Sequence, residues 1–263
     1  MTRLGLRRST GLLQLFGLLS RIKLARGADL ASAARIQYMF PLVGAILGAI
    51  VAVVSFLIFE VIGDAISSLT IALVAVLVLY FIYGIMHLEG LADFGDGVMA
   101  SGDTLKKRSA MKDVSVGAAG CFFMVVDLLL LVLLINELLG QTGPMLLVGI
   151  QIPLIFGLIV AEISAKLSMM TVMFIGPSSH EGMGSVFTSQ SSIKRFAAGL
   201  SISLLLSLLF IGIYFPIVLA GVLSGAFVAY LSRRHFGGVG GDSFGAANEL
   251  GRLVTLFIWV LVI

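Results

Sequence analysis

Charged residues are scarce in this sequence, and it contains few prolines, one tryptophan and one cysteine. Asp, Glu, Lys and Arg make up 12% of the 263 residues, whereas hydrophobic residues make up 59% and the mean hydropathy is +1.12. So little polar surface cannot cover a water-soluble globule of this length. A single cysteine, Cys121, excludes an intramolecular disulfide and a cysteine-rich metal site, and its apolar neighbours predict a buried bystander. The composition predicts an integral membrane protein.

Apolar stretches recur along the chain, at 40–59, 66–87, 117–136, 144–161, 196–215, 216–232 and 249–263. A helix needs about 20 mainly apolar residues to cross a bilayer, with some allowance for tilt. The last stretch has only eleven continuously apolar residues, so it crosses only if its helix begins near Asn248. We therefore expect an all-α, polytopic bundle of about seven transmembrane helices, with residues 1–39 as an N-terminal arm and 40–263 as a single transmembrane domain.

The basic residues predict the orientation. All 17 Lys and Arg lie in the arm or in the segments 88–116, 162–195 and 233–252, and the other connections have none. The positive-inside rule places the arm and these three segments in the cytoplasm, as expected for a multi-pass protein of the cell membrane. Within the arm, apolar residues at helical spacing predict an interfacial amphipathic helix. The membrane topology accounts for the net charge of +3. We therefore expect the lipid bilayer, and no nucleic acid, as a partner.

One segment gathers acidic residues, His87-Leu-Glu-Gly-Leu-Ala-Asp-Phe-Gly-Asp-Gly97. If it is helical, Glu89, Asp93 and Asp96 lie at i, i+4 and i+7 and share one face. Three unpaired carboxylates would raise one another's pKa values, and a hard cation such as Mg²⁺ would relieve this repulsion. The alternative is a solvated acidic helix end paired with the basic residues at 106–108. His87 would point to the opposite face, where packing is at least as good an explanation as catalysis.

Two further segments are candidates for substrate contacts. Asp113 is a candidate for a general base or a further metal ligand, and the adjacent Lys112 for a phosphate contact, although a helix cap with a lipid headgroup contact is the alternative. The second segment, Gly237–Gly245, has five glycines among its nine residues, and its backbone N–H groups could cradle an anion next to Asp242. It matches neither a P-loop nor a dinucleotide-binding motif, and a flexible hinge is the alternative.

Other polar positions are less informative. The segment 176–195, which includes Arg195, is polar and could cover a bound substrate. Asp127 lies deep in the third apolar stretch, where an ionisable residue is a functional candidate by default. A protonated or hydrogen-bonded packing residue is an equal alternative.

These motifs together, with Phe40-Pro-Leu-Val-Gly44 before them, resemble the cobalamin 5′-phosphate synthase family, also called adenosylcobinamide-GDP ribazoletransferase. The resemblance runs from about residue 20 to Gly251, and the block from His87 to Gly97 is its most specific part. Glu89 stands where Asp is expected and Lys112 where Arg is common, so the charge is kept at both positions. The resemblance implies a Mg²⁺-dependent membrane enzyme of late vitamin B12 assembly.

The resemblance also implies a reaction and roles. The enzyme would join adenosylcobinamide-GDP to α-ribazole, or to its 5′-phosphate, and release GMP. Glu89, Asp93 and Asp96 would hold Mg²⁺, with Asp113 and Asp96 as catalytic residues. The expected substrate-binding residues are Lys112, Arg195, Gly240, Gly241, Asp242 and Glu249. The sequence does not determine the oligomeric state, and a homo-oligomer is one option. It also does not determine whether the nucleophile carries a 5′-phosphate.

Two other functions remain as alternatives. Asp93-x-x-Asp96-Gly97-x-x-Ala100 also looks like the opening of the CDP-alcohol phosphatidyltransferase motif, although Ser101 replaces the basic residue that normally follows. The glycine-rich segment argues against a phospholipid enzyme. A secondary transporter would place coupling residues near the membrane midplane, whereas here the acids gather at one edge.

Overall fold

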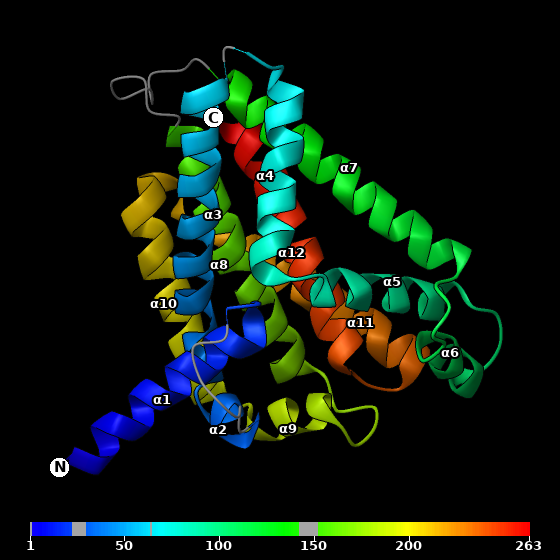
Figure 1. Cartoon of the computed structure of the whole chain (residues 1–263). Coiled ribbons are helices and arrows are strands. Elements are labelled where there is room, and N and C mark those ends of the chain that lie inside the picture. The colour runs from blue at the N-terminus through cyan, green and yellow to red at the C-terminus, as the bar shows by residue number, and fades with distance from the viewer. Residues whose placement is uncertain (1, 23–29, 64, 142–151) are drawn as a thin grey trace.

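The protein is a bundle of helices, seen in a computed structural model that describes residues 2–22, 30–63, 65–141 and 152–263 (Figure 1). No strand forms among these residues, which confirms the all-α prediction. The helices are α1 (Thr2–Leu19), α2 (Leu30–Arg35), η1 (Gln37–Met39), α3 (Phe40–Ile62), α4 (Ser68–Tyr83), α5 (Met86–Met99), α6 (Thr104–Met111), α7 (Ala118–Gly140), α8 (Ile152–Ile175), α9 (Met183–Gln190), α10 (Ile193–Ile211), η2 (Gly212–Leu219), α11 (Ala220–Phe236) and α12 (Gly241–Val262).

Several of these helices are long and apolar enough to cross a membrane. Within the described residues there are five such helical runs, or six if the bent pair α4 and α5 forms one span. The predicted count of seven is therefore not confirmed. The difference arises partly at 193–236, which counts as one run of 44 residues although the 3-10 segment η2 interrupts it, with Gly212 at φ 54° and Pro216 inside.

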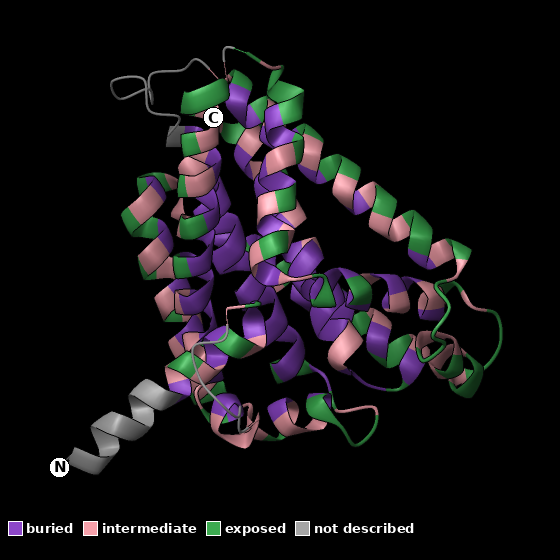
Figure 2. Cartoon of the chain, viewed as in Figure 1, coloured by how far each residue is buried: buried purple, intermediate pink, exposed green. Residues whose placement is uncertain are grey.

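Helix α8 is the centre of the bundle. Its most apolar 18-residue window is 89% buried, against 22–56% for the other four runs. The burial colouring shows α8 surrounded by helices whose outward faces are exposed (Figure 2). Those faces carry large apolar side chains such as Val53, Leu77, Leu129 and Leu209, as expected for surfaces that meet lipid.

Two predicted boundaries are wrong, for the same reason. The stretch expected at 144–161 is instead α8, which ends at Ile175 and contains Glu162 and Lys166; residues 142–151 lie outside the described part of the chain. The last helix begins at Gly241 and contains Arg252. Lys166 and Arg252, counted above among the cytoplasmic residues, are 0% and 1% exposed. Charged residues interrupt an apolar run in sequence, but opposite charges on neighbouring helices pair and allow both helices to continue.

Helix α5 runs almost at a right angle to α4. The two helices meet at 96°, and Gly84 ends α4 with φ 78°, in the left-handed region that favours glycine. The acidic helix α5 is therefore not a straight continuation of α4. The acidic segment 87–97 is nevertheless helical, as predicted.

The short helices do not all lie at the same end of the bundle. In Figure 1, α1, α2 and α9 lie at the lower end, α5 runs out sideways towards α6 on the right, and the C-terminus lies at the upper end. The N-terminal helix exists as predicted and buries Leu15 and Leu19. Cys121 is exposed on α7 rather than buried, because it lies on an outer face of the bundle.

Candidate active site

The site begins where two glycines let α5 and α12 touch. A Cβ atom on Gly90 would lie 3.1 Å from the Cα of Gly245 and 3.3 Å from the Cα of Asp242. A Cβ atom on Gly245 would lie 2.9 Å from the carbonyl oxygen of His87. Only residues without side chains allow so close an approach. This contact brings the acidic helix α5 beside the glycine-rich start of α12.

The contact gathers carboxylates from both helices. Partial burial raises the pKa of Asp93 to about 6, and neighbouring carboxylates add to the rise; in falling order of effect they belong to Asp242, Glu89 and Asp96. Within the described residues, the side chains of Glu89, Asp93 and Asp242 have no hydrogen-bond or ion-pair partner. The basic residues Lys107 and Arg108 instead donate to carbonyl oxygens at helix ends, Lys107 to Val98 and Ala100. The ion pairs with the basic residues at 106–108, which the alternative interpretation requires, are therefore not formed among the described residues.

Asp96 has a different environment from Asp93. Its two carboxylate oxygens accept hydrogen bonds from the backbone N–H groups of Gly117, at 2.7 Å, and Gly120, at 2.8 Å. Asp96 thus caps the start of α7. Together with the exposed Asp113 it lines an open depression on the outer side of α5. Both predicted catalytic residues, Asp96 and Asp113, consequently lie apart from Asp242.

On the other side, Asp242 borders a shallow polar cleft, here called the basic cleft. Its basic lining residues are Arg108, Lys112 and His180, and Gly238, Gly240 and Ser243 complete the wall around Asp242. Arg108 donates to the carbonyl oxygen of Phe236 at the end of α11. The charged side chains that act on Asp242 are, in falling order of effect, His180, Glu89 and Lys112. The structure therefore brings together three predicted substrate-binding residues, Lys112, Gly240 and Asp242, and it adds His180.

The glycine-rich segment is shorter as a loop than predicted. It pairs with the loop after α8 through Ser179 N–H to the Val239 carbonyl, at 2.9 Å, and Val239 N–H to the Pro177 carbonyl, at 2.8 Å. A Cβ atom on Gly238 would lie 2.5 Å from the Pro177 oxygen, which explains the glycine there. Helix α12 then starts at Gly241, so the free N–H groups of its first turn lie beside the basic cleft.

An apolar cavity of about 90 Å³ lies on the opposite side of Asp242. Its side chains are mainly Met and Phe, contributed by α3, α5, α8, α9 and α12. His87 lines this cavity and is 4% exposed, on a different side of α5 from Glu89. The predicted separation of His87 from the acidic face is confirmed.

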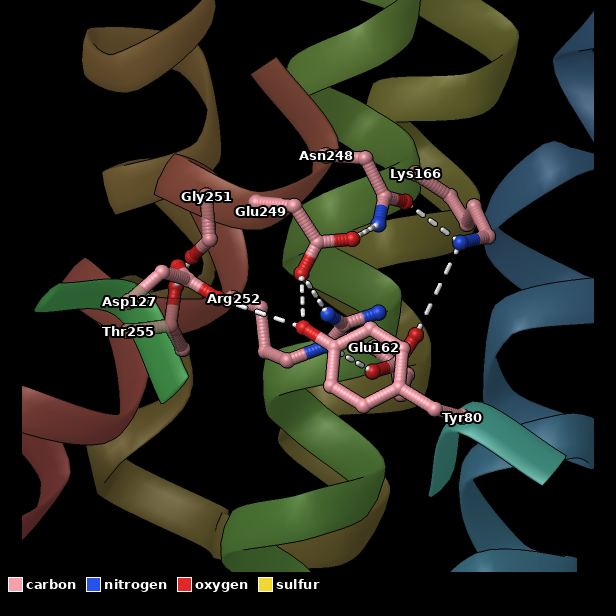
Figure 3. Close-up of polar contacts among 9 residues, drawn as sticks. All are labelled: Tyr80, Asp127, Glu162, Lys166, Asn248, Glu249, Gly251, Arg252 and Thr255. Carbon is pink, nitrogen blue, oxygen red and sulfur yellow. Dashed lines mark hydrogen bonds and ion pairs between the residues drawn. The ribbon is translucent and has the colours of Figure 1, made fainter. Parts of the chain in front are cut away.

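A second polar cluster is buried within the bundle (Figure 3). Arg252 forms ion pairs with Glu162 of α8 and Glu249 of α12, and Lys166 lies 3.6 Å from Glu162. The Tyr80 hydroxyl donates to Glu249 at 2.9 Å and lies 3.2 Å from Asp127. This buried ionic network joins α4, α7, α8 and α12. It explains why an ionisable residue, Asp127, lies inside the bundle.

Two predicted substrate-binding residues lie away from both cavities. Glu249 is 1% exposed and belongs to the buried ionic network. Arg195 donates to the carbonyl oxygen of Gln190 and connects α9 with α10. Sequence reasoning missed His180 because an isolated histidine in a polar loop has no motif, and it missed Arg252 as a buried residue because charge alone predicts exposure.

The residues fit a cation only in part. In the part of the chain that is described, no three His, Cys, Asp or Glu side chains form a group able to hold a metal ion on their own. Glu89, Asp93 and Asp242 nevertheless supply the oxygen ligands that Mg²⁺ prefers, and their mutual repulsion favours a cation. Mg²⁺ often uses one or two carboxylates, with water and substrate phosphates completing its shell. The donor set fits that kind of site rather than an all-protein cage.

Apolar helices that hold carboxylates, a basic cleft and an apolar cavity together at one end define a polytopic membrane enzyme. Comparison with known families identifies which one: the chain belongs to the cobalamin-5-phosphate synthase family, whose model matches residues 11–260. The protein is therefore a transferase of cobalamin biosynthesis.

Curated relatives support the family. The adenosylcobinamide-GDP ribazoletransferase of Methanococcoides burtonii is 32% identical over 255 residues, which cover 94% of this chain and 90% of the relative. That of Halorubrum lacusprofundi is 34% identical and covers 96% and 97%. That of Pyrococcus abyssi is 36% identical and covers 70% and 74%. No solved structure matches this chain.

Proposed function

We propose that the protein joins adenosylcobinamide-GDP to α-ribazole, or to α-ribazole 5′-phosphate, and releases GMP. The observation that carries this proposal is the position of Asp242. Its carboxylate lies with those of Glu89 and Asp93, and it separates the basic cleft from the apolar cavity. A reaction between a diphosphate and a ribose hydroxyl that is attached to a largely apolar aromatic base would use such a junction.

The basic cleft suits the diphosphate. Lys112 and His180 provide positive charge, and the first turn of α12 provides free N–H groups, a combination that binds phosphate oxygens well. Glu89, Asp93 and Asp242 would hold Mg²⁺, which neutralises charge on the phosphate oxygens during the displacement. Arg108 would support the cleft indirectly, since it binds the end of α11.

In the reaction, a ribose hydroxyl oxygen forms a bond to the phosphorus on the cobinamide side. The phosphorus–oxygen bond to GMP breaks, and GMP leaves with the bonding electron pair. The hydroxyl proton passes to a carboxylate. Asp242 is better placed to accept it than Asp113, because Asp242 borders both cavities whereas Asp113 lines the outer depression with Asp96.

The test is release of GMP by the purified protein in detergent with Mg²⁺, adenosylcobinamide-GDP and either form of ribazole. We expect release that stops with EDTA and returns with added Mg²⁺. Asp242→Asn should lower turnover at least about a hundredfold while leaving folded protein. Undiminished turnover in EDTA would refute the metal, and absence of GMP with both ribazoles would refute the reaction.

We further propose that the active-site end faces the cytoplasm in the cell membrane. The basic residues of α6, of the end of α11 and of the start of α10 lie at this end, and the described connections at the opposite end have none. The positive-inside rule then gives the orientation.

A further inference from the structure

The apolar cavity beside Asp242 has a chemically selective wall. Among its described lining residues, only His87 and Asp242 have polar side chains. Four methionines and three phenylalanines supply most of the rest: Met86, Met169, Met173, Met183, Phe40, Phe187 and Phe244. Methionine sulfur and aromatic edges favour a flat aromatic ligand.

His87 is the second observation that points to a ligand. Its Nε2 is buried and has no hydrogen-bond partner among the described residues. Buried polar groups in proteins nearly always have a partner, because leaving one without costs free energy. A ligand in the cavity with one polar ring atom would supply that partner.

The position of Asp242 restricts the ligand further. A molecule seated in the cavity with its polar end at Asp242 would present that end to the basic cleft. Ribazole has this form, since a methylated benzimidazole with one unsubstituted ring nitrogen is joined to a ribose. Guanine, the other aromatic base of the reaction, has several donors and acceptors that a wall with one imidazole and one carboxylate would leave without partners.

We propose that this cavity binds the benzimidazole base of the nucleophile, with the Nε2–H of His87 donating to the unsubstituted ring nitrogen and the ribose lying at Asp242. The inference rests on the proposed function and names the subsite for one of its two substrates. His87 is thus a binding residue for the base, and the methionines of α8 and α9 contact its ring and methyl groups.

The experiment measures KM separately for α-ribazole and for adenosylcobinamide-GDP. His87→Leu should raise the KM for α-ribazole about tenfold, as expected for loss of one buried hydrogen bond, and leave the KM for adenosylcobinamide-GDP within about twofold. His87→Gln, whose amide can donate in place of the imidazole, should recover part of the loss.

Two adjacent methionines provide a matched pair that does not depend on His87. Met169 lines the cavity, whereas Met170 packs against α10, where its terminal methyl would lie 2.3 Å from a Cβ on Gly199. Both side chains are buried, at 4% and 2% exposed. Met169→Ala should raise the KM for α-ribazole at least about fivefold and reduce its preference over the unmethylated benzimidazole riboside. Met170→Ala should change neither quantity.

The outcomes separate the two proposals. A wild-type protein that releases no GMP with either ribazole overturns the proposed function and this inference with it. An active wild type in which His87→Leu and Met169→Ala raise the KM for adenosylcobinamide-GDP, or leave the KM for α-ribazole unchanged, overturns only the inference. In the first of these cases the cavity would hold part of the nucleotide substrate.

Discussion

Asp93 and Asp96 lie less than one helical turn apart on α5, yet their carboxylates have different surroundings. Asp96 accepts two backbone hydrogen bonds at the start of α7, whereas Asp93 has none among the described residues and has carboxylates as neighbours. The hydrogen bonds of Asp96 therefore stabilise the fold, while the carboxylate of Asp93 is repelled by its neighbours. The two residues share a sequence motif but should respond differently to the same substitution.

The prediction compares Asp93→Ala with Asp96→Ala. Asp96→Ala should lower the free energy of unfolding by about 1–2 kcal/mol through loss of the helix cap. Asp93→Ala should leave the Tm in metal-free buffer unchanged or higher, and it should lower turnover at least about a hundredfold. Thermal unfolding in detergent checks both. Added Mg²⁺ should raise the Tm of the wild type but not of Asp93→Ala; equal responses to Mg²⁺ would argue against Asp93 as a ligand.

Arg252 is a charged residue inside the bundle, where it needs ion-pair partners. It pairs with Glu162 and Glu249, and all three side chains are at most 2% exposed. Removing one partner from a buried ion pair leaves an uncompensated charge. The network therefore stabilises the assembled bundle only while it is complete.

We expect Arg252→Ala to destabilise the protein by about 3–5 kcal/mol, which would appear as little folded protein after extraction. The exposed Arg233, at the end of α11, is a matched control, and Arg233→Ala should change stability by less than about 0.5 kcal/mol. Size-exclusion profiles and thermal unfolding measure both variants. Comparable yields and Tm values would show that Arg252 is not needed for packing.

Among the helices, the crossing of α5 over α12 determines the site. Gly90 and Gly245 allow the two backbones to touch, and this contact places Asp93 beside Asp242. The bend at Gly84 makes the crossing possible, since it turns α5 away from the direction of α4. A side chain at the crossing would move the carboxylates apart without removing any of them.

Gly245→Ala tests this geometry. The added methyl would lie 2.9 Å from the His87 carbonyl oxygen, so α5 must shift. We expect turnover to fall at least about tenfold and stability by about 1–3 kcal/mol. Gly140→Ala is the control, because a Cβ atom there meets nothing within 4 Å. GMP release by the two variants at equal folded concentration gives the comparison; similar rates would mean that the close contact does not matter.

At the scale of the whole molecule, the basic cleft and the apolar cavity share Asp242 at the start of α12, and the C-terminal end of that helix lies at the upper end of the bundle in Figure 1. Two groups of residues far apart in sequence, those of α5 and α6 and those of the start of α12, meet beside Asp242. With such an arrangement a charged substrate would reach the basic cleft from water, while the apolar cavity lies beside the bundle interior. It also makes the orientation in the membrane decisive for access to substrate.

Cysteine labelling tests the orientation. In a Cys121→Ser background, Ser109→Cys lies on α6 at the active-site end and Ala65→Cys lies in the connection at the opposite end. A membrane-impermeant maleimide should label Ala65→Cys in intact cells and Ser109→Cys only after lysis. The reverse pattern would place the active site outside the cytoplasm. Labelling of both after lysis is the control for accessibility.

Local sequence signals predicted part of the site well. The i, i+4, i+7 spacing placed Glu89, Asp93 and Asp96 on a helix, and the glycine-rich segment indicated that Asp242 adjoins an open loop. The partners of these residues were not predictable in the same way. Asp96 binds Gly117 and Gly120, and Asp242 meets His180, through contacts between distant segments that no local pattern encodes.

Composition and apolar periodicity depend on each residue and its near neighbours, so the membrane bundle, the helical acidic segment and the gathering of basic residues follow directly from the amino-acid order. Helix crossings and the burial of charge depend on which surfaces meet. The 96° turn into α5, the pairing of Glu162 with Arg252, and the place of Asp242 between a basic cleft and an apolar cavity arise only when the helices pack. Packing energy, not local preference, selects those contacts.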